Sequence, residues 1–381
     1  MDLDNNGFAL LRQLREKKVN QKLEYKKLKN YLELKARDKG IPVSGHFELT
    51  PLCNFNCRMC YVHLEPNQMK GQPVLSVETW KNLMHQAWEA GMLSVNLTGG
   101  ECLAYPGFEE LYLFLHSLGC EVGVLTNGYL LDEEKIQFFK EHPPAAIQVT
   151  LYGWNDDVYE RVTGQRAFSI VVNNIRRAVE TELPVCISIT PSSYLGEDLL
   201  ETIRVAKQIC DAVMINSAYS SPREETGRAG LQGDADIELY IRAYKYYDQL
   251  EGREPIEIEE KDLPPCGGPQ QETSKCGFTC GGGRSSFSIN WKGELKPCIE
   301  MEAIKAYPLK EGFATAWAKV NQAVNNWPRV SVCEGCVYND ICHNCASHVL
   351  QYAELGKQPY RLCEQTRELV RNGRFRLPEC K

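Results

Sequence analysis

Short apolar runs alternate with longer amphipathic stretches between residues 43 and 217. The apolar runs are rich in β-branched residues and end at polar or turn residues, which is typical of buried strands. The stretches between them repeat apolar residues every three or four positions, which predicts helices. Six strands alternating with helices indicate a parallel sheet, curved or doubly wound. The predicted strands are His46–Thr50, Leu93–Leu97, Glu121–Thr126, Ala146–Leu151, Val185–Thr190 and Ala212–Asn216.

The predicted helices have recognisable ends. Ser76 is a candidate N-cap for the helix after the first strand, Glu78 lies in its first turn, and Gly91 follows its end. The next helix stops at Gly119. This second helix is predicted over residues 108–118, and further helices are predicted over residues 132–141, 169–182 and 199–210.

The chain changes character on both sides of this region. Residues 8–37 show near-helical spacing, and the alternation of strands and helices stops after residue 217. From residue 263 the chain is rich in Cys, Gly and Pro and poor in aliphatic residues, which is typical of a segment that folds around metal. We therefore divide the chain into a basic helical extension, a sheet domain, a helical and acidic linker and a cysteine-rich domain, over residues 1–42, 43–230, 231–262 and 263–381.

Composition and charge restrict the setting of the protein. The first residues are acidic and polar, unlike a secretory signal, and no apolar run approaches the roughly 18 residues of a membrane span. We expect a cytoplasmic protein with no membrane partner. The net charge of −7 combines +5 in residues 1–41 with −12 in the remainder. The basic extension could bind an acidic peptide or nucleic acid, but we favour packing on the acidic body and expect no nucleic-acid partner.

Seventeen cysteines in a cytoplasmic chain point to metal or redox chemistry, because reducing compartments disfavour structural disulfides. Eleven fall into three closely spaced groups. The six others are mostly isolated, and three of them lie beside apolar runs, as buried structural cysteines do. These six are Cys102, Cys120, Cys186, Cys210, Cys266 and Cys380.

The first group, CxxxCxxC, directly follows the first predicted strand and contains Cys53, Cys57 and Cys60. Three thiolates on one tight loop suit three irons of a [4Fe–4S] cluster and leave the fourth iron open to a substrate. A structural zinc site needs four closed ligands, and only His63 follows at short spacing. A ferredoxin-like electron carrier is the other alternative.

Other polar residues also follow predicted strands. Gly99, Gly100 and Glu101 come after the second strand, TNG (126–128) ends the third, and Thr150 closes the fourth. Carboxyl ends of parallel strands meet at one edge of a sheet, where active sites form. The sequence therefore predicts one site that combines the cysteine loop with these residues.

With this arrangement, residues 43–217 resemble the radical S-adenosylmethionine (SAM) superfamily. The resemblance implies a partial (β/α)6 TIM-like barrel whose cluster binds SAM and cleaves it to a 5′-deoxyadenosyl radical. It also implies that Gly99, Gly100 and Glu101 hold the SAM amino group and that Met59 contacts adenine, where the family usually has an aromatic residue. Thr150 and Ser188 match strand-end positions that contact the ribose and carboxylate of SAM. Either could equally be a polar residue that satisfies a strand end.

The C-terminal cysteines are similar to those of the SPASM domain. The matching pattern runs from Cys276 to Cys363 and includes GxxxxC at Gly293 and a CxxC–x5–C run; two residues separate Cys342 from Cys345 where three are usual. The resemblance implies two auxiliary [4Fe–4S] clusters, hence three in all. It assigns Cys276, Cys280, Cys298 and Cys345 to the first and Cys333, Cys336, Cys342 and Cys363 to the second. Cys266 and Cys380 are rivals of Cys276 and Cys363, and a zinc ribbon is the alternative for residues 333–345.

Enzymes of this arrangement abstract hydrogen from a peptide or protein, and an auxiliary cluster then accepts an electron. The resemblance thus favours oxidative maturation of a ribosomal peptide by a thioether or carbon–carbon crosslink, with a flavodoxin or ferredoxin as reductant and an anaerobic host. Peptide maturases often carry a leader-binding domain ahead of the barrel, whereas 52 residues precede Cys53 here. We therefore expect a separate leader-binding protein or recognition by the basic helix.

Two alternatives remain open at the level of function. An anaerobic sulfatase maturase, which forms formylglycine, has an acidic residue directly after the GxxxxC cysteine, but this chain has Ile299 there and then Glu300, a possible acid or base. A non-catalytic iron–sulfur electron-transfer protein is the second alternative, and it predicts no cleavage of SAM.

Overall fold

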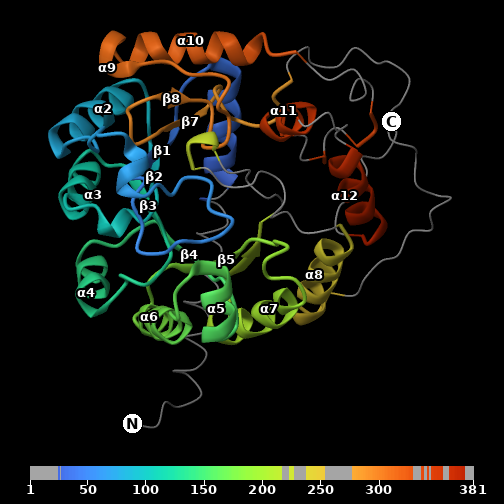
Figure 1. The fold of residues 1–381 in the computed structure, drawn as a ribbon. Coiled ribbons are helices and arrows are strands. Elements are labelled where there is room, and N and C mark those ends of the chain that lie inside the picture. The colour runs from blue at the N-terminus through green and yellow to red at the C-terminus, as the bar shows by residue number, and fades with distance from the viewer. Residues whose placement is uncertain are drawn as a thin grey trace, which may run out of the picture.

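One eight-stranded sheet organises the computed structural model, which describes residues 25, 27–216, 223–226, 237–253, 277–328, 336–338, 341–342, 345–354 and 360–373. The strand order is β6-β5-β4-β3-β2-β1-β7-β8, and every pair is parallel except β7 with β8 (Figure 1). The strands are β1 (Ser44–Glu48), β2 (Ser94–Thr98), β3 (Glu121–Thr126), β4 (Ala146–Thr150), β5 (Val185–Ile189), β6 (Val213–Ile215), β7 (Ser286–Ile289) and β8 (Leu295–Lys296).

Helices follow the strands and cover the outer side of the curved sheet (Figure 1). Their buried residues join one continuous hydrophobic core with the strands, so the sheet is covered as parallel sheets require. These helices are α2 (Val77–Glu89), α3 (Phe108–Ser117), α4 (Glu133–Glu141), α5 (Asp156–Thr163), α6 (Phe168–Glu180) and α7 (Asp198–Ile209). The later helices are α8 (Ile237–Leu250), α9 (Pro308–Glu311), α10 (Phe313–Asn325), α11 (Ala346–Glu354) and α12 (Tyr360–Arg371).

All six strands expected from the sequence are present, with ends within two residues of the predicted ones. The predicted barrel-like α/β fold is thereby confirmed. Helix α5 was not predicted, although its ends carry standard signals. The Asn155 side chain accepts a hydrogen bond from the Val158 backbone N–H at 2.8 Å, and Gly164 ends the helix with a left-handed φ of 75°.

The C-terminal segment shares the core of the barrel, which the shortage of aliphatic residues did not suggest. Strand β7 pairs with β1 in parallel, with Phe47 opposite Ile289. The ring centroid of Phe287 lies 5.9 Å from that of Phe47 and 5.0 Å from that of Phe313. Aromatic residues therefore supply the apolar surface that joins this segment to the barrel.

The segments expected to be a linker and an extension also pack on the barrel. Helix α8 covers the edge of the sheet, because the Tyr244 and Tyr247 hydroxyls donate to carbonyl oxygens of β6 at 2.9 and 2.7 Å. Residues 27–39 are helical, and Lys29 Nζ lies 2.8 Å from a carboxylate oxygen of Glu121. That ion pair is the kind of contact expected if the basic helix packs on the acidic body.

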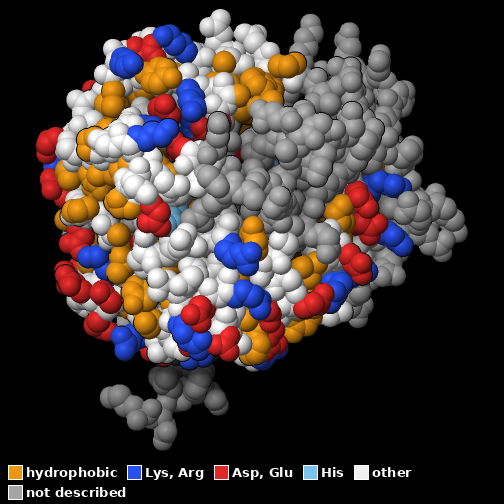
Figure 2. All heavy atoms as spheres, viewed as in Figure 1, with side chains coloured by type: hydrophobic (Ala, Val, Ile, Leu, Met, Phe, Trp, Pro, Cys, Tyr) orange, Lys and Arg blue, Asp and Glu red, His pale blue; other side chains and the backbone are white. Residues whose placement is uncertain are grey.

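The described surface carries charges of both signs. In the view of Figure 2, acidic and basic side chains lie interspersed over the helices around the sheet. Among the described residues, no helix combines the length and apolar character that crossing a membrane requires.

Candidate functional site

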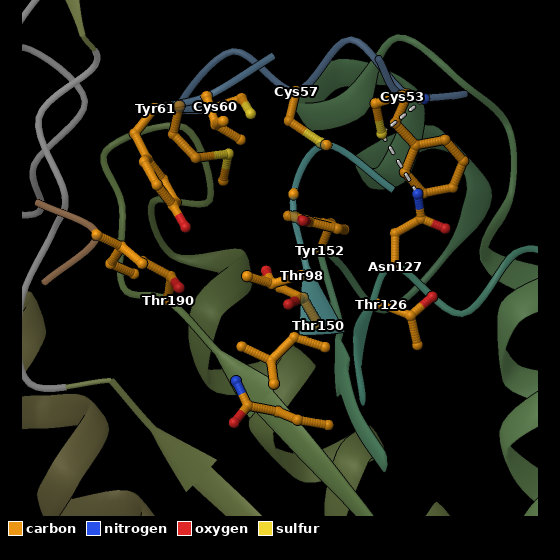
Figure 3. Close-up of a pocket in the computed structure, with 18 of the residues that line it drawn as sticks. Cys53, Cys57, Cys60, Tyr61, Thr98, Thr126, Asn127, Thr150, Tyr152 and Thr190 are labelled. Atoms are coloured by element: carbon orange, nitrogen blue, oxygen red, sulfur yellow. Dashed lines mark hydrogen bonds between the residues drawn. The ribbon is translucent and has the colours of Figure 1, made fainter. Parts of the chain in front are cut away.

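A cavity of about 390 Å³ lies at the carboxyl ends of the parallel strands. Its volume falls within the range of small-molecule sites. Figure 3 shows the three cysteines of the first group along one side and strand-end hydroxyl groups below them. Apart from Glu300, the polar side chains that line it are neutral; those from the strands and their ends are Thr98, Thr126, Asn127, Gln148, Thr150, Thr190 and Asn216.

Hydrogen bonds fix the thiols of the cysteine loop. The Cys53 sulfur accepts from the Phe55 backbone N–H at 3.4 Å and from Asn127 Nδ2 at 3.5 Å (Figure 3). The Cys60 sulfur accepts from the His63 backbone N–H at 3.3 Å. Burial, together with the charge of Glu101, raises the pKa of the Cys53 thiol to about 12. Bound iron would have to displace that proton, as metal binding does at thiol ligands.

Helix α5 anchors the middle of this loop. The backbone N–H groups of Asn56 and Arg58 donate to the carbonyl oxygens of Thr163 and Val162 at 2.9 and 3.0 Å. These carbonyls lie at the C-terminal end of α5, where helices have unpaired acceptors. The unpredicted helix therefore shapes the loop that carries the thiols.

The three cysteines fit a cluster with three protein ligands. All three thiols line one cavity. Burial raises the pKa of the Tyr152 hydroxyl, and electrostatic interaction with Cys57, Cys60 and Cys53 raises it further, so all three thiols lie near this hydroxyl. His63, the only nearby candidate for a fourth zinc ligand, does not line the cavity; its ring lies 3.8 Å from Glu65. The described residues thus favour an open cluster over a closed zinc site.

The GGE segment packs tightly under the cysteine loop. A Cβ at Gly100 would lie 2.2 Å from the Leu52 carbonyl oxygen, and Gly99 has a φ of 142°, so both positions require glycine. The Gly100 and Glu101 backbone N–H groups donate to the Thr50 and Leu52 carbonyls at 2.7 and 2.9 Å. The glycines therefore bring the TGGE turn against the chain that leads into Cys53.

Glu101 lies behind the lining of the cavity and accepts hydrogen bonds from two of the residues that line it. Its fully buried carboxylate accepts hydrogen bonds from Thr126 Oγ1 and the Asn127 backbone N–H, both at 2.8 Å. Burial raises the pKa of this carboxyl group. These contacts hold Thr126 and Asn127, which are two of the residues that line the cavity, and contact of Glu101 with the SAM amino group stays a prediction.

The other predicted SAM contacts divide into two sets. Met59, Gly99, Gly100 and Thr150 line the cavity, whereas Ser188 is fully buried and does not. Ser188 donates to Asn216 Oδ1 at 3.2 Å, and Asn216 Nδ2 donates to Thr190 Oγ1 at 2.7 Å.

The cavity also has polar residues that the sequence did not single out, namely Gln148, Thr190 and Asn216, whereas Asn127 belongs to the predicted TNG strand end. Thr190 and Asn216 directly follow β5 and β6, and this strand-end position was the available signal, as it was for Thr150; Gln148 lies in the middle of β4 and gave no such signal.

The C-terminal segment closes one side of the cavity with Ile299 and Glu300. One Glu300 carboxylate oxygen lies 2.7 Å from Nε2 of the buried His348 and 4.0 Å from the Cys345 sulfur. Burial and then Glu300 raise the pKa values of Cys298 and Cys345 to about 12. Cys280 contributes to both shifts, so these three cysteines lie close together, as the first auxiliary set requires. Cys276 lies outside the described residues.

Part of the second auxiliary set also comes together. Cys336 and Cys342 pack against the small apolar cluster of Tyr338 and Val370. Thr366 Oγ1, one turn after Cys363 in α12, lies 3.3 Å from the Cys342 sulfur. Cys333 and the two rival cysteines, Cys266 and Cys380, lie outside the described residues.

Comparison with known proteins identifies the family. The radical SAM superfamily model matches residues 47–215. The probable GTP 3′,8-cyclase of Aeropyrum pernix is 30% identical over 265 residues, which cover 66% of this chain and 72% of that protein. The chain belongs to the radical SAM superfamily. Membership implies binding of SAM and of a [4Fe–4S] cluster.

Two curated relatives from Bacillus subtilis match shorter shares of their own length. The sporulation killing factor maturation protein SkfB is 26% identical over 170 residues, covering 44% of this chain and 40% of SkfB. The antilisterial bacteriocin subtilosin biosynthesis protein AlbA is 25% identical over 261 residues, covering 68% of this chain and 55% of AlbA. The matched regions thus span about half the length of these relatives.

Solved structures share the fold over most of the chain. Streptococcus suis SuiB has a TM-score of 0.63 at 16% identity, covering 92% of this chain and 81% of SuiB. The anSMEcpe structure with bound AdoMet has a TM-score of 0.62 at 15% identity, covering 87% of this chain and 97% of anSMEcpe. At these identities the likeness establishes the fold alone.

Proposed function

We propose that this protein uses SAM to abstract a hydrogen atom from a peptide and completes an oxidative crosslink of that peptide. The observation that carries the proposal is the single cavity shared by three thiols, the strand-end polar groups and Glu300. When bound, SAM and its cluster supply a 5′-deoxyadenosyl radical for hydrogen abstraction. The remaining arguments concern what the residues of this chain contribute.

The barrel residues bind and orient the cofactors. Cys53, Cys57 and Cys60 would hold the cluster, and Met59, Gly99, Gly100 and Thr150 would contact SAM from the cavity wall. Glu101 would act chiefly by holding Thr126 and Asn127 in place. Asn127 would in turn orient Cys53 through its hydrogen bond to the sulfur.

The C-terminal cysteines are proposed to hold two auxiliary [4Fe–4S] clusters. Cys280, Cys298 and Cys345 would bind the first with Cys276, and their mutual proximity supports this set. Cys336, Cys342 and Cys363 would bind the second with Cys333, supported by the contact between Thr366 and Cys342. Such clusters suit an oxidative reaction, because the substrate must lose an electron and a proton after losing a hydrogen atom.

Three comparisons support a peptide substrate. SkfB and AlbA are named for maturation of a killing factor and biosynthesis of a bacteriocin. SuiB has been solved with its precursor peptide SuiA. A flavodoxin or ferredoxin would supply electrons, and a separate protein or the basic helix would bind the leader.

Glu300 favours a second candidate, formylglycine formation as in sulfatase maturation. Its carboxylate lines the cavity, two residues after Cys298, and His348 holds it at 2.7 Å. In that reaction Glu300 would accept the proton that leaves the substrate. A substrate with a single reactive cysteine or serine separates this candidate from crosslinking, because only crosslinking joins two residues.

The test combines cofactor analysis with product analysis. Anaerobic reconstitution should load about twelve iron atoms, and dithionite-reduced enzyme should convert SAM to 5′-deoxyadenosine. Cysteine-rich peptides encoded beside the gene should include one that loses about 2 Da, and tandem mass spectrometry should locate the new bond.

Parallel incubations and specific failures decide between the alternatives. GTP serves as a parallel substrate, since one relative is named a GTP cyclase. About four irons would contradict the auxiliary clusters. If the reduced protein forms no 5′-deoxyadenosine from SAM, the non-catalytic electron-transfer alternative is favoured. Consumption of GTP without a change in any peptide would contradict the proposed peptide substrate.

A further inference from the structure

A buried arginine joins the barrel to the C-terminal segment beside the cavity. Arg223 is 7% exposed, and its Nη1 and Nη2 atoms lie 2.9 and 2.5 Å from the two carboxylate oxygens of the fully buried Glu48. Nη2 also donates to the Ile299 carbonyl at 2.9 Å, and Nε lies 2.9 Å from Glu302 Oε1. The guanidinium therefore contacts two carboxylates and one backbone carbonyl at once.

These partners belong to the segments that carry the proposed chemistry. Glu48 ends β1, five residues before Cys53, and the Arg223 backbone N–H donates at 3.2 Å to the carbonyl of Tyr61, which follows Cys60. Ile299 and Glu302 flank Glu300 and follow Cys298. We call residues 298–302 the cysteine turn. Arg223 thus lies between the cysteine turn and the barrel's cysteine loop, which carries Cys53, Cys57 and Cys60.

Ion pairs of Glu302 hold the cysteine turn in one position relative to the barrel. Lys296 is fully buried and its Nζ lies 2.6 Å from Glu302 Oε1, while Lys305 Nζ lies 2.9 Å from Oε2 of the same residue. Glu302 is thereby shared by Arg223, Lys296 and Lys305. A displaced turn would leave Arg223 with one carboxylate fewer in a buried setting, which is costly. A planar guanidinium with fixed donor directions tolerates such displacement less well than a lysine does.

We propose that Arg223 is a positioning residue that docks the cysteine turn onto the barrel. It thereby sets where Glu300 enters the cavity and where Cys298 lies relative to the cysteine loop. This role deepens the proposed function, because substrate oxidation after hydrogen abstraction requires both groups to be in place. A displacement of about 1 Å in such a site can lower a reaction rate about a hundred-fold.

Hydrogen exchange on the reconstituted protein tests the docking without SAM or substrate. R223K keeps the charge but loses the fork that reaches Glu48, Ile299 and Glu302 together. We expect faster amide exchange in R223K over residues 298–302. The matched control is R242K, because Arg242 makes a similar two-pronged pair with Glu197, at 2.9 and 2.6 Å, on the surface. Unchanged exchange over 298–302 in R223K would overturn the proposal.

The second readout is the number of 5′-deoxyadenosine molecules formed for each modified peptide. Unfolded enzyme adds to neither number, so a loss of folded protein leaves this ratio unchanged. We expect a ratio of about one for wild type and R242K and a rise of about three-fold or more for R223K. E48Q/R223Q, which removes both charges of the pair, should behave like R223K. A wild-type ratio in R223K and E48Q/R223Q would overturn the proposal, as would loss of the C-terminal irons in R223K.

These readouts separate two kinds of failure. If wild-type enzyme forms no modified peptide, the proposed function fails, and hydrogen exchange still decides the role of Arg223. If wild-type enzyme is active and both variants match it, only the role of Arg223 fails.

Discussion

At the residue scale, the site depends on small polar groups placed where strands end. Thr98, Thr150 and Thr190 each lie at or just after the end of a parallel strand and line the cavity. Each is an ordinary strand-end residue by itself. Parallel strands carry them to the same edge, so a shared cavity results from the topology.

The cysteine loop supports a prediction about cofactor loading. Cys57→Ala should remove about four of about twelve irons and abolish formation of 5′-deoxyadenosine, because two thiols cannot hold the cluster. Cys120→Ala is the control, since Cys120 is buried at the start of β3 and does not line the cavity. Iron analysis and chromatography of the nucleoside product provide the measurements. A Cys57→Ala enzyme that still cleaves SAM would show that another ligand set binds it.

Glu302 should make stability depend on acid pH. Burial raises its pKa, but Lys296 and then Arg223 outweigh this and lower it from the usual 4.5 to about 2. Because the folded-state pKa is depressed, its stabilisation is present above about pH 4.5 and is lost as the pH falls towards 2.

The free-energy difference between wild type and Glu302→Gln should therefore be smaller at about pH 3.5 than at about pH 6. Urea unfolding under argon at both pH values measures it. Glu160→Gln is the control, because Glu160 pairs with Arg166 on the surface, where both side chains are more than half exposed and solvent screens the interaction. An equal difference at the two pH values would contradict the depressed pKa.

At the scale of elements, the turn after β2 determines where the cysteine loop lies. The backbone of Gly100 approaches that of Leu52 so closely that no side chain fits between them. Gly99 and Gly100 therefore act first on the geometry of the loop, whatever they contact in SAM. Helix α5 supports the same loop from the other side through two carbonyl groups.

Gly100→Ala should disrupt this turn, since its Cβ would lie 2.2 Å from a backbone oxygen. We expect weaker cluster binding and a lower free energy of unfolding. Gly119→Ala is the matched control: its φ is 75°, but a Cβ there meets nothing within 4 Å, so it should cost only about 1 kcal/mol of backbone strain. Iron content and urea unfolding compare the two variants. Equal behaviour would show that the turn relaxes easily.

At the scale of the whole molecule, the barrel and the first part of the C-terminal segment share one core. Phe287 is fully buried between Phe47 and Phe313, and β7 extends the sheet beyond β1. Without β7, the edge of β1 would be open to other chains. The segment is therefore part of the barrel's fold as well as the carrier of its cysteines.

Phe287→Ala should lower the free energy of unfolding by about 3–5 kcal/mol and destabilise barrel and segment together. Leu93→Ala, at a position 54% exposed, should have little effect. Unfolding followed by tryptophan fluorescence and by cluster absorbance should give one shared transition. If cluster absorbance is lost at a lower denaturant concentration than the change in tryptophan fluorescence, the barrel and the C-terminal segment do not unfold as one unit, and a shared core is contradicted.

Several features were determined by the sequence itself. The six strands, most helices and the cysteine loop followed from local periodicity, caps and spacing, which depend on residues near one another in the chain. Gly99, Gly100 and Thr150 were placed at the site because they follow or close predicted strands, and Met59 because the resemblance to the radical SAM superfamily implies it. The family resemblance rested on the same local patterns.

Only the tertiary structure decided which distant residues meet. Ser188 and Glu101 lie beneath the cavity instead of lining it, because their side chains bond to neighbouring elements. The meeting of Arg223 with Glu48 and the cysteine turn joins residues separated by 175 and 76 positions. No local periodicity encodes such contacts, since they depend on how the C-terminal segment packs against β1. Sequence thus determined the elements and the chemistry of their ends, and packing decided which ends share a site.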